Sequence, residues 1–222
     1  MIPPRATAAF VWAMADGREV YTRPDDPRRP PGCRDETSQP WVAETREPVP
    51  AAPGRPQRGD DEDERQGPAT LGLGFEPWAG QRRVHVTERR TAVDVAPLSR
   101  AVVEEPSPHA EKFVLVLDNL HTHPPASLSE ALAPAAARRV RERLELQHTP
   151  KPGSWLTMAE TARRVLATPC VDRRIPDPAA LNRPVAAWAR RRHAAQGRGD
   201  WRFTTHAARI NLKRLSPSIQ LG

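Results

Sequence analysis

Two patterns of hydrophobic and polar positions predict two kinds of strand. Residues 112–117 form a nearly continuous apolar run that ends at Asp118, which is typical of a strand buried on both faces of a sheet. Over residues 83–88, valines alternate with polar residues, as they do in a strand with one buried face. Further strands are predicted over residues 69–76 and 144–148.

Helices are predicted from composition, apolar spacing and capping residues. Residues 6–16 have a helix-compatible composition, with a strand as the alternative. Thr91 can cap a helix that ends near Glu105, because Asp94 occupies its third position. The remaining predicted helices cover residues 127–143 with a break at Pro134, residues 155–167 after an N-cap at Ser154, and residues 178–195.

Proline is concentrated in two stretches near the start of the chain. Four prolines lie within residues 23–31 and five within residues 48–68. Proline cannot donate to a sheet and interrupts helices, so we expect the strand that ends at Asp35 to be short or frayed. The acidic run over residues 60–64 makes the second stretch a predicted solvated loop.

The order of these elements predicts the fold class. A strand, a hairpin, a helix, a strand ending in Asp, further helices, a strand and a helix bearing Glu follow one another. This order is expected of an α/β fold with a ribonuclease-H-like mixed central sheet flanked by helices. Such a sheet gathers carboxylates from separate elements at one edge. Phosphodiester chemistry needs such a cluster, because carboxylates can hold two Mg²⁺ ions about 3.5–4 Å apart.

Several sequence blocks together resemble one family. They are FVLVLDNLHTH at residues 113–123, HTPKPGSWLTMAE at residues 148–160, DRRIP at residues 172–176, the segment over residues 201–215, and the region over residues 25–46. They are similar to successive motifs of the insertion-sequence 630 family of DDE transposases, which are relatives of the mariner elements. The resemblance implies metal-dependent DNA strand cleavage and strand transfer in DNA transposition.

The resemblance also assigns the site, position by position. It implies that Asp35, Asp118 and Glu160 are the catalytic residues and the ligands of two Mg²⁺ ions, for which Mn²⁺ can substitute. An Asn that the family has three residues before the last Glu is here Thr157. The supporting positions are occupied by Asn119, His123 and Trp155.

The charge distribution predicts a nucleic-acid partner. The net charge of +7 is uneven, since residues 111–222 hold 19 Lys and Arg against 9 Asp and Glu. A polyanion would bind this half. We therefore expect a nucleic acid as the partner, and the resemblance implies that it is DNA, as transposon ends and target, bound by a homodimer on paired ends. The residues predicted to contact DNA are Lys151, Arg163, Arg164, Arg173 and Arg174.

The resemblance also predicts the domain organisation. We expect residues 1–22 to be the remnant of a linker or helix behind a missing helix-turn-helix region, in a truncated and divergent family member. Residues 23–200 are the predicted catalytic domain, and residues 201–222 are predicted to form a basic helical tail.

Cys33 and Cys170 lie outside any zinc spacing and are expected to be packing residues. No apolar stretch approaches the roughly 20 residues of a membrane span, so a soluble intracellular protein is predicted, and the resemblance implies a DNA-associated protein of the bacterial cytoplasm.

Two alternatives stay open. The chain could be a catalytically inactive transposase remnant that binds DNA without sequence specificity, or that has no function, because prolines interrupt the strand before Asp35. His121 and His123 could bind zinc in principle, but no obvious Cys, Asp or Glu set completes such a site.

Overall fold

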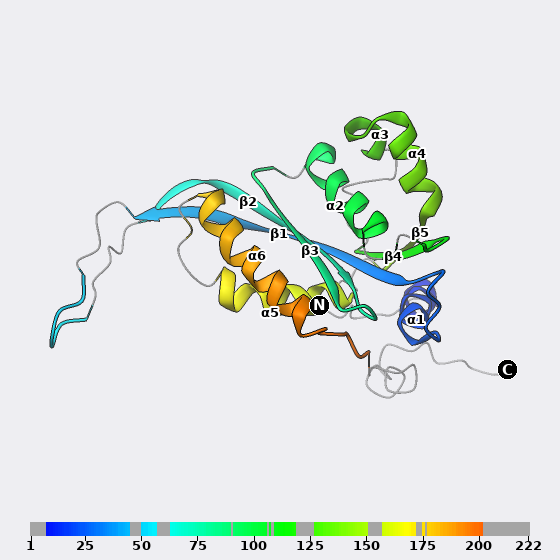
Figure 1. The fold of residues 1–222 in the computed structure, drawn as a ribbon, viewed down its shortest axis with the longest axis horizontal. Helices are drawn as coiled ribbons and strands as arrows, with labels where there is room; N and C mark the ends of the chain where they lie inside the picture. The colour runs from blue at the N-terminus through cyan, green and yellow to red at the C-terminus, as the bar shows by residue number, and fades with distance from the viewer. Residues whose placement is uncertain are drawn as a thin grey trace.

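A mixed five-stranded sheet forms the centre of the protein. The computed structural model describes residues 8–44, 50–56, 63–89, 91–105, 107, 109–118, 127–150, 157–171, 175 and 177–201. The strands are β1 (Pro31–Glu44), β2 (Asp63–Glu76), β3 (Gln81–Thr87), β4 (Phe113–Leu117) and β5 (Leu144–His148). Their order is β3-β2-β1-β4-β5, with antiparallel pairs from β3 to β1 and parallel pairs from β1 to β5 (Figure 1). The predicted ribonuclease-H-like fold class is confirmed.

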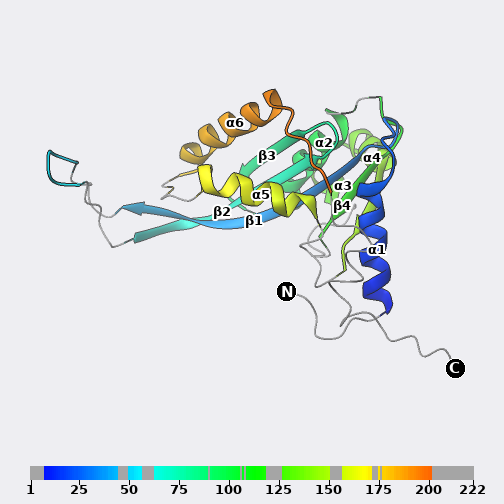
Figure 2. The same cartoon turned by 90° about the horizontal axis from the view of Figure 1, so that it is seen from below.

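Helices cover both faces of this sheet. They are α1 (Ala8–Thr22), α2 (Ala92–Glu104), α3 (Leu128–Ala131), α4 (Pro134–Arg143), α5 (Met158–Cys170) and α6 (Pro178–Ala194). Residues of α5 and α6 share one hydrophobic cluster with the sheet, and residues of α2, α3 and α4 share a second (Figure 2). None of the helices within the described ranges is long and apolar enough to cross a membrane.

Strand β4 confirms the prediction of a strand buried on both faces. All five of its residues are buried. Phe113, Leu115 and Leu117 pack in the cluster with α2, whereas Val114 and Val116 pack in the cluster with α5. The alternation follows from the two-residue period of a strand. Apolar residues at every position are therefore needed.

Strand β1 is longer than predicted. It covers the 14 residues Pro31–Glu44, so the expectation of a short or frayed strand that ends at Asp35 was wrong, because the strand continues past Asp35. The carbonyl of Pro30 accepts a hydrogen bond of 3.1 Å from the Val114 N–H, and Pro31 is the first residue of the strand, where proline is tolerated. Pro40 lies opposite Pro68 in the part of β1 that pairs only with β2. Proline removes a donor but keeps its acceptor, and Pro30 uses that acceptor to bond with β4.

Three other boundaries differ from the sequence expectation. β2 begins at Asp63, so the predicted loop over residues 48–68 was too long. Thr157 is the N-cap of α5, whereas the predicted cap Ser154 lies outside the described residues. The same helix continues through Pro169 rather than ending before it.

Several local predictions are confirmed. The carboxylate of Asp94 accepts a hydrogen bond of 2.9 Å from the Thr91 N–H, as a capping box at the start of α2 requires. A break between α3 and α4 occurs at Pro134, and β5 covers the predicted residues. Residues 6–16 fall mainly in helix α1 instead of a strand. Cys33 and Cys170 are both buried, as packing residues are.

Replacing Gly74 with alanine should destabilise the fold. An added Cβ at Gly74 would overlap Cγ2 of Val102 on α2, because α2 lies directly on β2 at this point. We expect Gly74→Ala to lower the free energy of unfolding by about 1–3 kcal/mol in urea denaturation followed by circular dichroism.

Gly17→Ala is the matched control for that experiment. No atom lies within 4 Å of a Cβ added at Gly17, which is inside α1. Alanine in a helix interior should raise the free energy of unfolding by up to about 1 kcal/mol. Equal effects of the two substitutions would contradict the close approach of α2 to β2.

Candidate active site

The parallel pairing of β1 and β4 aligns the first two predicted catalytic residues. In its register Arg34 lies opposite Leu117, so the residues that follow, Asp35 and Asp118, come next to each other. Asp118 directly follows β4, and β1 continues past Asp35. Because parallel strands present their carboxyl ends at the same edge, both aspartates belong to one edge of the β1–β4 pair.

Asp35 faces helix α5, and the alternation along β4 predicts the same side of the sheet for Asp118. Cys33 and Val116, which precede them by two residues, pack in the hydrophobic cluster that contains α5. Residues two apart in a strand share a face, so Asp35 and Asp118 point toward the same side. The opposite face at this position is taken by Arg34, whose guanidinium donates a hydrogen bond of 2.6 Å to Ser99 of α2.

Glu160 is held in the first turn of α5 by a helix cap. The side-chain oxygen of Thr157 accepts a hydrogen bond of 3.3 Å from the Glu160 N–H. Thr157 itself is buried, so the cap is fixed against the sheet. Thr157 therefore starts the helix that carries Glu160.

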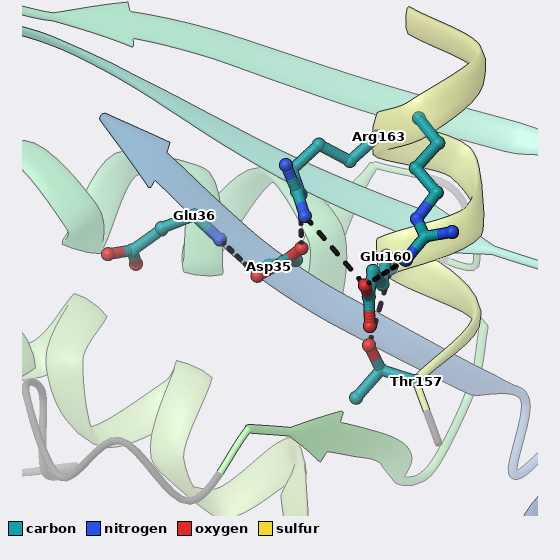
Figure 3. A network of polar contacts seen from close by, with 6 residues as sticks. Asp35, Glu36, Thr157, Glu160 and Arg163 are labelled. Atoms are coloured by element: carbon teal, nitrogen blue, oxygen red, sulfur yellow. Dashed lines mark hydrogen bonds and ion pairs between the residues drawn. The ribbon is translucent and has the colours of Figure 1, made fainter. Parts of the chain in front are cut away.

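One guanidinium lies between two of the three carboxylates. Nε of Arg163 donates a hydrogen bond of 2.8 Å to Oδ2 of Asp35, and Nη2 of Arg163 lies 4.0 Å from Oε1 of Glu160 (Figure 3). Nη2 of Arg164 is 3.0 Å from the same oxygen of Glu160. Asp35 of β1 and Glu160 of α5 are thus brought together through Arg163.

The environment of Asp35 combines burial with opposite charges. Burial raises the pKa of the Asp35 carboxyl group, and the hydrogen bond and charge of Arg163 act in the other direction. The Glu36 N–H, at 2.8 Å from Oδ1, also favours the ionised form, whereas the negative charge of Glu160 opposes it. The net effect is a raised pKa of the Asp35 carboxyl group, for which burial is the main cause.

The nearby cysteine does not add a nucleophile. Cys33 is fully buried two residues before Asp35, and its thiol donates to the Phe75 carbonyl over 3.5 Å. Burial is the main cause that raises the pKa of the Cys33 thiol to about 12. The thiol therefore stays protonated at neutral pH, and only the thiolate is a strong nucleophile.

Asp118 is oriented by a residue that sequence analysis missed. The hydroxyl of Thr149 lies 3.4 Å from Oδ1 of Asp118 as a donor, and its backbone N–H donates to the Leu117 carbonyl over 2.9 Å. Thr149 is buried and directly follows β5, which is parallel to β4. Thr149 directly follows β5, just as Asp118 directly follows β4, and β4 and β5 are parallel neighbours. This matching place after adjacent strands is the signal that could have identified Thr149.

The structure describes only some of the site residues that were predicted from the sequence. The described ones are Asp35, Asp118, Glu160, Arg163 and Arg164. Within the described ranges, no group of three or more His, Cys, Asp or Glu side chains is close enough to hold a metal ion. Outside the described residues lie Asn119, His121, His123, Lys151, Trp155, Arg173 and Arg174.

The paired carboxylates fit a hard divalent cation in their chemistry. Mg²⁺ and Mn²⁺ bind carboxylate oxygens. Oε2 of Glu160 is buried and accepts no hydrogen bond from the part of the chain that the structure describes. A buried oxygen without a partner is unfavourable unless a ligand satisfies it. Asp35 and Glu160 could therefore hold such an ion, whereas Asp118, which follows the neighbouring strand, does not complete a group of three with them among the described residues.

Comparisons with solved structures give distant similarity. The Mos1 mariner paired-end complex with Mn is 16% identical, with a TM-score of 0.37, over 89% of this chain and 65% of that chain. The Mos1 strand transfer complex is 14% identical, with a TM-score of 0.36, over 90% of this chain and 65% of that chain. This chain thus spans about two thirds of the length of these structures or slightly less. A comparison with curated proteins gives no significant match.

The family comparison is more specific. The sequence pattern described as DDE superfamily endonuclease matches residues 32–182, and this segment includes Asp35, Asp118 and Glu160. It covers more than half of the 222 residues. The chain therefore belongs to the DDE superfamily endonuclease family.

Proposed function

We propose that this chain is the catalytic domain of an insertion-sequence 630 family transposase, which cleaves DNA strands and joins them to a target. Asp35, Asp118 and Glu160 are its proposed metal ligands, for two Mg²⁺ ions or Mn²⁺ as their substitute. The observation that carries the proposal is the pairing of Asp35 with Glu160 through Arg163, at the edge where Asp118 follows the neighbouring strand. Membership in the DDE superfamily endonuclease family supports it.

Each carboxylate in this proposal has a separate structural support. Asp35 belongs to a long central strand, Thr149 orients Asp118, and the Thr157 cap holds Glu160 at the start of α5. Bound metal ions would supply activation of the attacking oxygen and stabilisation of the leaving oxygen of a phosphodiester. The protein's own task is to keep three oxygen ligands in place from three rigid elements. Water attacks first and the freed 3′-hydroxyl second, and no covalent enzyme intermediate is required.

Neutralising Asp118 should abolish DNA cleavage. Asp118→Asn keeps the size of the side chain but removes its charge, so a metal-dependent reaction should slow by about 100-fold or more. The measurement is nicking of supercoiled plasmid in Mg²⁺ or Mn²⁺, with a chelator as the blank. The matched control is Glu130→Gln, an exposed carboxylate on α3 that should leave the rate unchanged. Cleavage equal in Asp118→Asn and the wild type, or absent from both, would remove the enzymatic proposal.

A second candidate function is non-specific DNA binding by an inactive domain. The observation that favours it is the exposure of several arginines on α5 and α6 within the basic half of the chain. These exposed arginines are Arg164, Arg183, Arg190 and Arg191. Phosphate contacts by such residues do not need an intact metal site.

DNA binding should depend on salt and should survive loss of the metal site. We expect Asp118→Asn to bind duplex DNA within about twofold of the wild-type affinity, because phosphate contacts dominate affinity. Combined Arg190→Gln and Arg191→Gln substitutions should reduce the slope of log K against log salt by up to about 2. Fluorescence anisotropy at several salt concentrations measures both. Arg28→Gln, an exposed arginine in the first half of the chain, is the control, and an unchanged slope in the double variant would contradict phosphate contact by α6.

A further inference from the structure

The Arg163 guanidinium occupies the position of a cation between two proposed metal ligands. Its Nε is 2.8 Å from Oδ2 of Asp35, and its Nη2 is 4.0 Å from Oε1 of Glu160 (Figure 3). The side chains of Asp35 and Glu160 are each 17% exposed, and that of Arg163 is 29% exposed. Two carboxylates that converge with so little solvent repel each other unless a positive charge lies near them.

A divalent ion bound to Asp35 would have to approach the carboxylate that this guanidinium already contacts. Oδ1 of Asp35 already accepts from the Glu36 N–H, so Arg163 uses the other oxygen of the carboxylate. A metal ion bound to Asp35 and Glu160 would lie within a few ångströms of the Arg163 charge, where repulsion is strong. That repulsion would weaken the contact of Arg163 with Asp35 while both carboxylates bind the ion.

We infer that Arg163 is an internal counter-cation of the metal site. It holds Asp35 and Glu160 together in the metal-free protein, and it leaves Asp35 when a divalent ion binds. The affinity of the site for metal is therefore set by competition with Arg163, which is a positioning residue. This inference rests on the proposed function only in taking Asp35 and Glu160 as metal ligands.

Arg164 provides the matched control. It contacts the same Oε1 of Glu160 at 3.0 Å, and it carries the same charge. Its side chain is 74% exposed, and the ion pair joins residues four apart on α5, so solvent screens it. The contact to Asp35 is made by Arg163. A charge effect specific to the space between the carboxylates should appear in Arg163 variants and be small in Arg164 variants.

The test is Mn²⁺ binding without DNA, measured by the electron paramagnetic resonance signal of free Mn²⁺. Arg163→Gln should tighten binding by about three- to tenfold, the order expected when one partly buried ion pair no longer competes. Arg163→Lys, which keeps the charge, and Arg164→Gln should stay within about twofold of the wild type. Circular dichroism of each variant checks that it folds.

A second measurement uses the wild-type protein and needs no folded variant. The Arg163 side-chain N–H signal in a ¹⁵N-resolved spectrum should shift on addition of Mg²⁺ and exchange faster with water, because its hydrogen bond to Asp35 is lost. Mn²⁺ binding that Arg163→Gln leaves unchanged or weakens, or an Arg163 signal insensitive to Mg²⁺, would overturn the role of Arg163 alone. Absence of Mn²⁺ binding from the wild type and all variants would overturn the proposed metal site and this role with it.

Discussion

The parallel pairing of β1 with β4 is the constraint on which the site depends. Its register brings the residue after Arg34 and the residue after Leu117 to one edge, which is why two aspartates separated by more than eighty positions become neighbours. A slip by one residue would turn every following side chain of a strand to the opposite face. The burial of β4 between two hydrophobic clusters opposes such a slip, because each face needs its own apolar residues.

Packing of α5 on the sheet completes this arrangement. Ala159 and Ala162 are small and buried in the cluster with Cys33, so the helix approaches β1 closely. Glu160 and Arg163 each directly follow one of these alanines in the sequence. Their side chains lie at the edge of the contact between α5 and the sheet and are partly shielded from solvent. The same packing that excludes water from the core therefore lowers the local screening around the carboxylates, which strengthens both their repulsion and their attraction to cations.

Local sequence signals predicted the elements that depend on local physics. The apolar run of β4, the Thr91 cap of α2 and the break at Pro134 are each encoded within a few residues, and all three were predicted. The length of β1 was missed, because its pairing with β2 involves residues far along the chain and because Pro30 still offers an acceptor.

In the candidate site, too, local features were predicted from the sequence and long-range contacts were not. The motifs around Asp118 and Glu160 are local and marked both residues, but the partner of Arg163 lies 128 residues away in the sequence. Arg163 was predicted as a DNA contact, and only the packing of α5 on β1 shows its ion pair with Asp35. Thr149 carries no motif of its own, so its contact with Asp118 also required the order of the strands.

The place of Glu160 in the first turn of α5 links the site to the stability of that helix. The peptide dipoles of a helix sum to a partial positive charge at its first turn, where a carboxylate stabilises the helix by about 0.3–1 kcal/mol. The same helix holds Arg163 and packs against β1 and β2. Folding of α5 and assembly of the carboxylates are thus coupled through one side chain. A substitution of Glu160 would therefore weaken both the helix and the candidate site. A substitution of Asp118, which follows β4, would affect the candidate site and leave the sheet intact.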